Sequence, residues 1–274
     1  MLLLEPTTPN LYAVKQYGHL LLDIEGTIVL DKQYSPVPGA VRWFNSLAEN
    51  GVKARLVTNN TTESPEELYR ILRRKGFRFE MADYFTCLIE AVVRMKRKNI
   101  QRCLVLGRKT IKDYLKRNGI KPVRTPFAEA VLVGHDNTLN YKRLNMAVRA
   151  IADHGAILFT LHRNRRFVDE WGQIALSAGP ITAALENACM VRATVCGKPN
   201  RRFFLDSIKG WDVPRSKILM VSDDPFADLV GAKKLGLATC WVLTGSQRDP
   251  KAAAKIPRQS RPDFIFNSVV DIPS

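Results

Sequence analysis

Short apolar runs alternate with segments of helical periodicity along most of this chain. The runs at 20–22 and 218–221 are continuously apolar, which is typical of strands covered on both faces of a sheet. Strands that alternate with helices in this way predict parallel β–α–β units. The predicted strands are residues 19–23, 53–58, 102–106, 130–133, 156–160, 217–222 and 238–243. The predicted helices are residues 39–49, 65–75, 84–98, 111–118, 141–154, 179–187, 201–209 and 228–235.

The middle of the chain carries its own set of predicted strands and helices. Three strands outside it end in acids or amides, at Asp23, at Thr58-Asn59-Asn60 and at Ser222-Asp223-Asp224. In an open α/β sheet, ligands bind beyond the carboxyl ends of the strands. We therefore predict an α/β protein in which residues 1–80 and 191–274 form one domain. Residues 81–190 form a second α/β domain inserted into the first.

The composition is that of a globular protein from a reducing compartment. With 274 residues, 46% of them hydrophobic, the chain can bury one large core or two moderate ones. No run is long enough to span a bilayer, and the start at Met1–Pro6 is too short for a secretory signal. The five cysteines are odd in number and scattered, and the four histidines are dispersed, which argues against a zinc site. We expect a cytoplasmic protein.

The net charge of +16 is concentrated in the predicted inserted domain. Residues 81–190 hold 18 Lys and Arg against 9 Asp and Glu, a net charge of +9. The basic series between Lys96 and Arg117 lies mostly at helical or loop positions without interleaved aromatics, and no known nucleic-acid motif is present, so the charge argues only weakly for nucleic-acid binding. Steering of small anionic substrates explains the bias, as does a simple solvated face.

Asp23 and Glu25 are the strongest candidates for chemistry. They follow a buried strand and precede Gly26, and two acids at such a strand end can hold a cation, attack an electrophile or move a proton. An acidic turn that merely ends the strand is the alternative. Taken singly, Asn59 also reads as a turn residue, Lys198 as an exposed loop lysine and Asp228 as a first-turn acid of a helix.

Four motifs in order make the functional interpretation the stronger one. They are Asp23-Ile24-Glu25-Gly26-Thr27, Thr58-Asn59-Asn60, Gly197-Lys198-Pro199, and Asp223 with Asp228 five positions later. Together they resemble the haloacid dehalogenase superfamily of phosphotransferases. The stretches 58–67, 131–144, 230–245 and 261–265 are similar to its 4-nitrophenylphosphatase, or NagD-like, branch (subfamily IIA). The resemblance implies a doubly wound, Rossmann-like parallel-sheet core with an inserted α/β cap that determines substrate specificity.

The resemblance also implies a role for each motif residue. Asp23 would be the nucleophile, and Glu25 would occupy the position of the acid and base. Asp23, the main-chain carbonyl of Glu25 and Asp223 would hold Mg²⁺. Thr58, the Asn59 backbone and Lys198 would bind the phosphoryl oxygens. Asp228, and Asp224 beside it, would play a secondary role; for Asp228 a water-mediated contact to the metal and orientation of Lys198 both stay open.

The chain departs from the family pattern at three places. Glu25 stands where the branch usually has Asp, and Ser222 stands where it usually has Gly. The cap loop is basic, where relatives often carry an Asn and an Asp. The candidate specificity residues of this loop are His162, Arg163, Asn164 and Arg165, followed by Arg166. Arginine side chains suit a second phosphate or a carboxylate on the substrate, and a solvated charged face is the alternative.

Two functions follow from these observations. The first is a Mg²⁺-dependent phosphatase that hydrolyses a small phosphorylated metabolite through an aspartyl-phosphate. The second is a catalytically weak or inactive protein of the same fold that binds an anionic ligand or partner through its basic cap. The resemblance also makes a homodimer through the cap possible, because members of this branch often dimerise there.

Overall fold

Two compact units are present in the computed structural model, which describes residues 14–168 and 172–273. The first contains the described residues up to Val57, together with Arg70–Tyr84 and the chain from Ser207 onward. The second contains Thr58–Tyr69 and Phe85–Asp206. Contacts thus group residues 58–69 and 191–206 with the second unit, whereas the sequence assigns them to the first domain. The run Met1–Pro6 lies outside the described residues.

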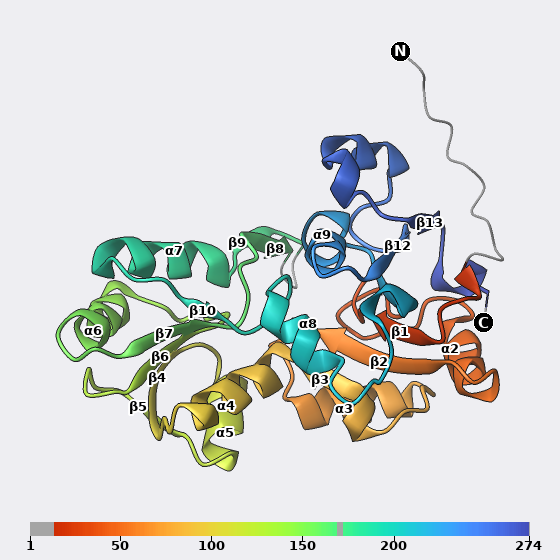
Figure 1. Cartoon of the computed structure of the whole chain (residues 1–274). Coiled ribbons are helices and arrows are strands. Elements are labelled where there is room, and N and C mark those ends of the chain that lie inside the picture. The colour runs from red at the N-terminus through yellow and green to blue at the C-terminus, as the bar shows by residue number, and fades with distance from the viewer. Residues whose placement is uncertain (1–13, 169–171, 274) are drawn as a thin grey trace. The chain divides into compact units, whose positions relative to one another are not determined.

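The first unit is built on a six-stranded sheet with the order β13-β12-β11-β1-β2-β3 (Figure 1). Strand β1 pairs in parallel with β2 and β11, and β12 pairs in parallel with β11 and β13. From β1 the chain passes to β2 on one side, and β11 lies on the other, so the strand order reverses beside β1. The strands are β1 (His19–Leu22), β2 (Lys53–Thr58), β3 (Tyr84–Thr86), β11 (Ile218–Ser222), β12 (Ala238–Val242) and β13 (Phe264–Phe266).

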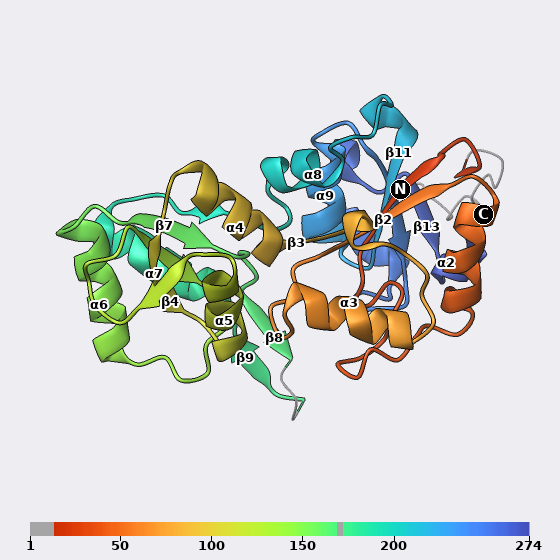
Figure 2. The same cartoon turned by 90° about the horizontal axis from the view of Figure 1, so that it is seen from below.

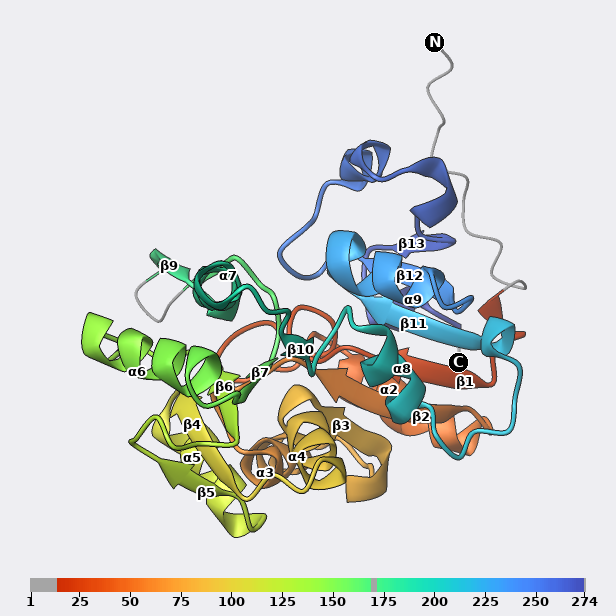
Figure 3. The same cartoon turned by 60° about the vertical axis from the view of Figure 1, so that its left-hand side comes forward.

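The second unit is built on a five-stranded parallel sheet with the order β10-β7-β6-β4-β5. Helices α4 and α5 lie on one face of this sheet, and α6 and α7 lie on the other (Figure 3). The strands are β4 (Arg102–Leu106), β5 (Lys121–Val123), β6 (Ala130–Val133), β7 (Ile157–Thr160) and β10 (Thr194–Val195). The helices are α4 (Cys87–Arg97), α5 (Lys109–Arg117), α6 (Tyr141–Ala152) and α7 (Ala178–Cys189).

Strand β6 shows why its sequence is apolar at every position. Ala130 and Leu132 pack into the core on the α4 and α5 face, whereas Val131 and Val133 pack into the core on the α6 and α7 face. All four side chains are fully buried. Two-sided burial removes the polar alternation of a half-exposed strand. The predicted α/β class, with parallel sheets covered by helices, is therefore confirmed.

The shortest strands are not predicted from the sequence. The antiparallel hairpin of β8 (Arg166–Val168) and β9 (Ile174–Leu176) extends away from the five-stranded sheet (Figure 2). The sequence predicts neither these strands nor β3, β5, β10 and β13. Each of the six has only two or three residues, which is too few to show a periodicity.

Two helices begin at residues other than those predicted, because their N-terminal capping residues lie at other positions. The helix predicted from residue 84 begins at Cys87, since residues 84–86 form β3 and Thr86 caps α4 by accepting a hydrogen bond from the Ile89 amide at 3.1 Å. The helix predicted from residue 228 is a π-helical turn, Pro225–Leu229, followed by α9 (Val230–Lys233). Asp224 caps this turn, and Pro225 occupies its first position.

The remaining helices follow the hydrophobic pattern within a few residues. They are α2 (Ala40–Glu49), α3 (Pro65–Arg74) and α8 (Arg201–Ser207). Among the described residues, none of the helices combines the length and the apolar character that crossing a membrane requires.

Candidate active site

Asp23 and Asp223 lie at the carboxyl ends of the neighbouring strands β1 and β11. The Asp23 amide continues the pairing of these strands by donating to the Val221 carbonyl at 3.0 Å. Both side chains are buried, with 8% and 7% of the residue exposed. Because the strand order reverses beside β1, these acids occupy the position where doubly wound sheets bind ligands.

The hydroxyl of Ser222 connects two carboxylates of this site. It donates to Asp228 Oδ2 at 2.9 Å and lies 3.4 Å from Asp23 Oδ2. A hydroxyl has one proton to donate, so it satisfies one of these two oxygens at a time. Ser222 thus fills the place usually held by Gly with a side chain that contacts the predicted nucleophile and the predicted secondary acid.

The carboxylate of Asp223 lies between two glycines. A Cβ added at Gly26 or Gly245 would come within 2.5 or 2.0 Å of Asp223 Oδ2, so only glycine fits at either position. Gly26 also has a φ of +76°, in the left-handed region. The same carboxylate oxygen accepts hydrogen bonds from the Ser246 amide at 2.8 Å and the Ser246 hydroxyl at 3.0 Å. Asp223 is held directly against the turn that carries Glu25.

Asp224 has a raised pKa, because it is buried close to two other acids. Burial, together with the neighbouring charges of Asp228 and Asp223, raises the pKa of Asp224 to about 6. Asp224 also accepts from the amides of Phe226 and Ala227 at 2.9 Å each. Buried carboxylates that repel one another are an environment that a cation would stabilise.

Oxygen donors at this strand end fit Mg²⁺. Asp23 and Asp223 offer carboxylates, and Glu25 offers a main-chain carbonyl between them in sequence, which are the ligand types that Mg²⁺ takes. Within residues 14–168 and 172–273, no three His, Cys, Asp or Glu side chains are grouped so as to hold a metal ion by themselves. A metal here would therefore need main-chain and water oxygens, as Mg²⁺ sites commonly use.

Asn59 and Lys198 come together in the second unit, and Thr58 precedes Asn59 in the chain. The Asn59 side chain donates to the Lys198 carbonyl at 3.0 Å and accepts from the Lys198 amide at 2.9 Å. Thr58 Oγ1 accepts from the Asn60 amide at 2.9 Å, and the Lys198 residue is only 2% exposed. The sequence predicts all three residues as site residues, with Asn59 contributing only its backbone. It does not predict the contact of the Asn59 side chain with the backbone of Lys198.

Gly197 allows this arrangement. A Cβ at residue 197 would lie 2.2 Å from Asn59 Oδ1 and 2.5 Å from the Leu161 carbonyl. No side chain fits there without displacing the Asn59 side chain that holds the Lys198 backbone, or the backbone of Leu161. Gly197 directly precedes Lys198 in the predicted motif, so the glycine in the sequence already indicates that the backbone is closely packed at this point.

The cap loop residues differ in what they contact. His162 is buried, and burial lowers its pKa to about 4, with a smaller effect from His135. Arg163 is paired with Glu186 of α7, through Nη1 to Oε2 at 3.0 Å and through Nη2 to Oε1. Asn164 and Arg165 are exposed. The structure thus places His162 within the fold and gives Arg163 a partner that the sequence does not predict.

The chain is similar to known hydrolases over most of its length. Two family models match it: haloacid dehalogenase-like hydrolase over residues 20–121, and HAD hydrolase-like over residues 195–272. The human haloacid dehalogenase-like hydrolase domain-containing protein 2 is 33% identical over 230 residues, which are 84% of this chain and 85% of the relative.

Solved phosphatases share the fold. The p-nitrophenyl phosphatase from Archaeoglobus fulgidus matches with a TM-score of 0.82 and 25% identity, over 92% of this chain and 96% of that one. The glycerol phosphate phosphatase from Mycobacterium tuberculosis, solved in complex with magnesium, matches with a TM-score of 0.79 and 26% identity, over 94% of this chain and 78% of that one. The chain belongs to the haloacid dehalogenase-like hydrolase family, in its NagD-like, 4-nitrophenylphosphatase branch.

Proposed function

We propose that this protein is a Mg²⁺-dependent phosphatase that hydrolyses a small phosphorylated metabolite through an aspartyl-phosphate on Asp23. The observation that carries this proposal is the set of buried acids at the ends of β1 and β11, with Ser222 in contact with both Asp23 and Asp228. The phosphatases among the solved structures of the same fold support it.

The proposed reaction has two steps on one phosphorus atom. In the first, a carboxylate oxygen of Asp23 bonds to phosphorus, the bond to the leaving oxygen breaks, and the carboxyl of Glu25 gives that oxygen a proton. In the second, the Glu25 carboxylate takes a proton from water, the water oxygen bonds to phosphorus, and the bond between phosphorus and the Asp23 oxygen breaks. The Asp23 carboxylate is regenerated, and inorganic phosphate is released.

Charge must be balanced when a carboxylate attacks a phosphate dianion. Bound Mg²⁺ would supply positive charge that offsets the negative charge of the reacting groups. Asp23, the Glu25 carbonyl and Asp223 are the residues proposed to hold it, with Asp224 and Asp228 in supporting positions. Thr58, the Asn59 amide and Lys198 are proposed to bind the non-bridging phosphoryl oxygens.

A screen of phosphorylated metabolites with and without Mg²⁺ tests the proposal. We expect phosphate release from at least one substrate, its loss on treatment with a chelator, and its return when Mg²⁺ is added in excess. Calcium in place of magnesium serves as the control, because it binds the same oxygen ligands with a looser geometry. Turnover that is unchanged by the chelator would contradict the role of the metal.

The inactive alternative rests on Glu25 and on the basic second unit. Glu is one methylene longer than Asp, and a displacement of about 1 Å at a reacting group can cost about a hundredfold in rate. If the screen finds no substrate while the protein still binds inorganic phosphate, the anion-binding alternative replaces the phosphatase.

Arg165 is the better probe of substrate specificity in the cap loop. It is exposed, whereas the Arg163 guanidinium is already paired with Glu186. If the loop binds a second anionic group of the substrate, Arg165→Ala should raise KM for a substrate with two anionic groups by about threefold to tenfold and leave KM for an aryl phosphate unchanged. Equal KM values before and after the substitution would assign Arg165 to a solvated face.

A further inference from the structure

The loop that carries Lys198 is fixed at both ends. It joins β10 to α8, and the Asn59 side chain holds the backbone of Lys198 at its first turn. At its far end, the main-chain amide of Asn200 donates to the Gly197 carbonyl at 3.0 Å, and the side-chain Oδ1 of Asn200 accepts from the main-chain amide of Arg202 at 2.8 Å. Asn200 therefore closes the turn around Lys198 and begins α8.

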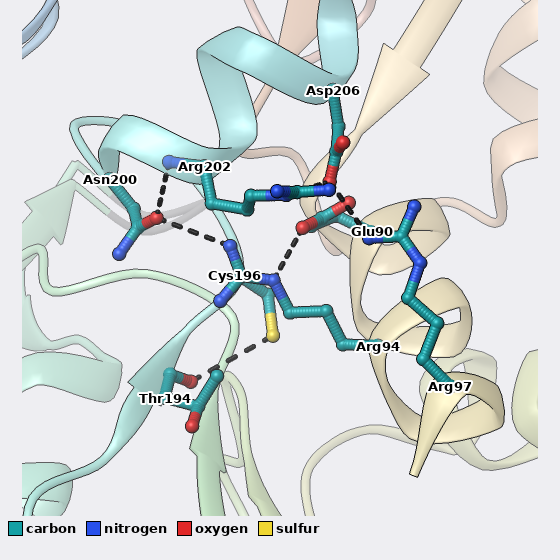
Figure 4. Close-up of polar contacts among 8 residues, drawn as sticks. All are labelled: Glu90, Arg94, Arg97, Thr194, Cys196, Asn200, Arg202 and Asp206. Carbon is teal, nitrogen blue, oxygen red and sulfur yellow. Dashed lines mark hydrogen bonds and ion pairs between the residues drawn. The ribbon is translucent and has the colours of Figure 1, made fainter.

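Arg94 of α4 binds the side chain that closes this turn. Its Nη2 donates to Asn200 Oδ1 at 3.2 Å, and its Nε donates to Glu90 one helical turn earlier (Figure 4). The side chain of Glu90 is fully buried, and that of Arg94 is 14% exposed. The guanidinium thus reaches the Lys198 loop from a helix in the same unit.

Glu90 also faces the charged side of α8. Asp206 accepts from Arg202 Nε at 2.8 Å and from Arg97 Nη1 at 3.3 Å, and these groups surround the Glu90 carboxyl (Figure 4). Glu90 Oε2 has no hydrogen-bond donor among the described residues. Burial, with a smaller contribution from Asp206, raises the pKa of Glu90 to about 7, although the Arg94 guanidinium acts in the opposite direction. A protonated Glu90 can donate a hydrogen bond to Asp206 and still accept one from Arg94.

A buried ionic network is a poor way to gain stability alone. Well-packed apolar residues of similar volume would often be as stabilising as a buried Glu–Arg pair, because they avoid the cost of desolvation. What the pair supplies is a fixed direction for the Arg94 guanidinium, which reaches a single oxygen of Asn200.

We propose that Arg94, oriented by Glu90, is a positioning residue that fixes Asn200 and thereby the loop presenting Lys198. This inference rests on the proposed role of Lys198 in binding the phosphoryl group. Arg94 acts through the loop and has no direct role in the reaction.

A double-mutant cycle tests the coupling. Arg94→Met should lower kcat/KM by about tenfold to a hundredfold in the otherwise unchanged protein, the scale expected for a misplaced catalytic group. In a Lys198→Ala background the same substitution should have almost no further effect, because the group it positions is gone. Arg102→Met is the matched control, since Arg102 forms an exposed ion pair with Glu129 at 3.3 Å in the same unit, and kcat/KM should be unchanged.

Two variants of Glu90 separate positioning from simple packing. Glu90→Gln keeps an oxygen for Arg94 and gains a donor for Asp206, so it should retain kcat/KM within about threefold of the wild type. Glu90→Leu fills the space without orienting Arg94 and should lose activity as Arg94→Met does. Hydrogen exchange at the Lys198 and Arg202 amides should accelerate in Arg94→Met and Glu90→Leu, and this readout does not depend on activity.

The outcomes keep this inference distinct from the proposed function. If Lys198→Ala leaves turnover intact, the proposed role of Lys198 fails and the positioning role fails with it. If Lys198→Ala abolishes turnover while Arg94→Met behaves as Arg102→Met does, the proposed function stands and the positioning role is overturned. Equal losses from Arg94→Met with and without Lys198 would also overturn it, because they would show independent effects.

Discussion

Asp23→Asn is expected to reduce turnover by at least about a thousandfold while the protein stays folded. An amide oxygen is a far weaker nucleophile than a carboxylate, and removal of an attacking group typically costs several kcal/mol of transition-state stabilisation. The fold should survive, because Asn keeps an oxygen that can accept from the Ile24 amide, now bound to Asp23 Oδ1 at 2.8 Å. Initial rates of phosphate release, compared with thermal unfolding of the same samples, measure both effects.

Asp212→Asn is the matched control for this substitution. Asp212 is exposed and belongs to the first unit, so its replacement by Asn changes the net charge equally without altering the acids at the strand ends. Its rate should equal that of the wild type. A normal rate for purified Asp23→Asn would show that Asp23 is not the nucleophile.

The second large effect is expected at Glu25, and it should depend on the leaving group. Glu25→Gln cannot give a proton, and general acid–base catalysis is worth about a hundredfold to ten-thousandfold. Alkyl phosphates, whose leaving oxygen needs a proton, should lose most of this rate in the first step. Aryl phosphates should lose less in that step, because their leaving groups depart as anions. Pre-steady-state release of the leaving group, measured for one substrate of each kind, separates the two steps.

Glu25→Asp distinguishes an impaired enzyme from an adapted one. If the extra methylene misplaces the carboxyl, Glu25→Asp should raise turnover of alkyl phosphates more than that of aryl phosphates. If the site has been rebuilt around Glu, the same substitution should lower both. An absence of any change, together with no substrate in the screen, would favour the anion-binding alternative.

The parts of the fold that the sequence predicts are those whose pattern is set by burial alone. Strand β6 is apolar throughout because both of its faces are covered, and its four consecutive apolar residues indicate this in the sequence. Strand β3 is not visible, since residues 84–86 are followed directly by the apolar face of α4 and pass for its first turn. Its strand geometry depends on the neighbouring edge of β2, which no local pattern records.

The candidate site also contains residues that a local sequence pattern predicts and contacts that no local pattern predicts. The acids Asp23 and Asp223 are predictable because each directly follows an apolar strand, and the ends of parallel strands meet at one edge. The pairing of Asn59 with Lys198 is not, because it joins residues 139 positions apart through a side chain that also suits a turn. Nothing near Arg163 in the sequence indicates Glu186, and no local signal places Ser246 beside Asp223.

The most direct test of the central claim is a search for covalent phosphate on Asp23. Protein mixed with an aryl phosphate and Mg²⁺, quenched in acid and digested, should yield the peptide containing Asp23 with the added mass of one phosphoryl group. The label should be lost on treatment with hydroxylamine, which cleaves acyl phosphates, and should accumulate further in Glu25→Gln because hydrolysis of the intermediate is slowed. Substrate turnover with no label on Asp23 in either protein, or with label on another residue, would contradict the account.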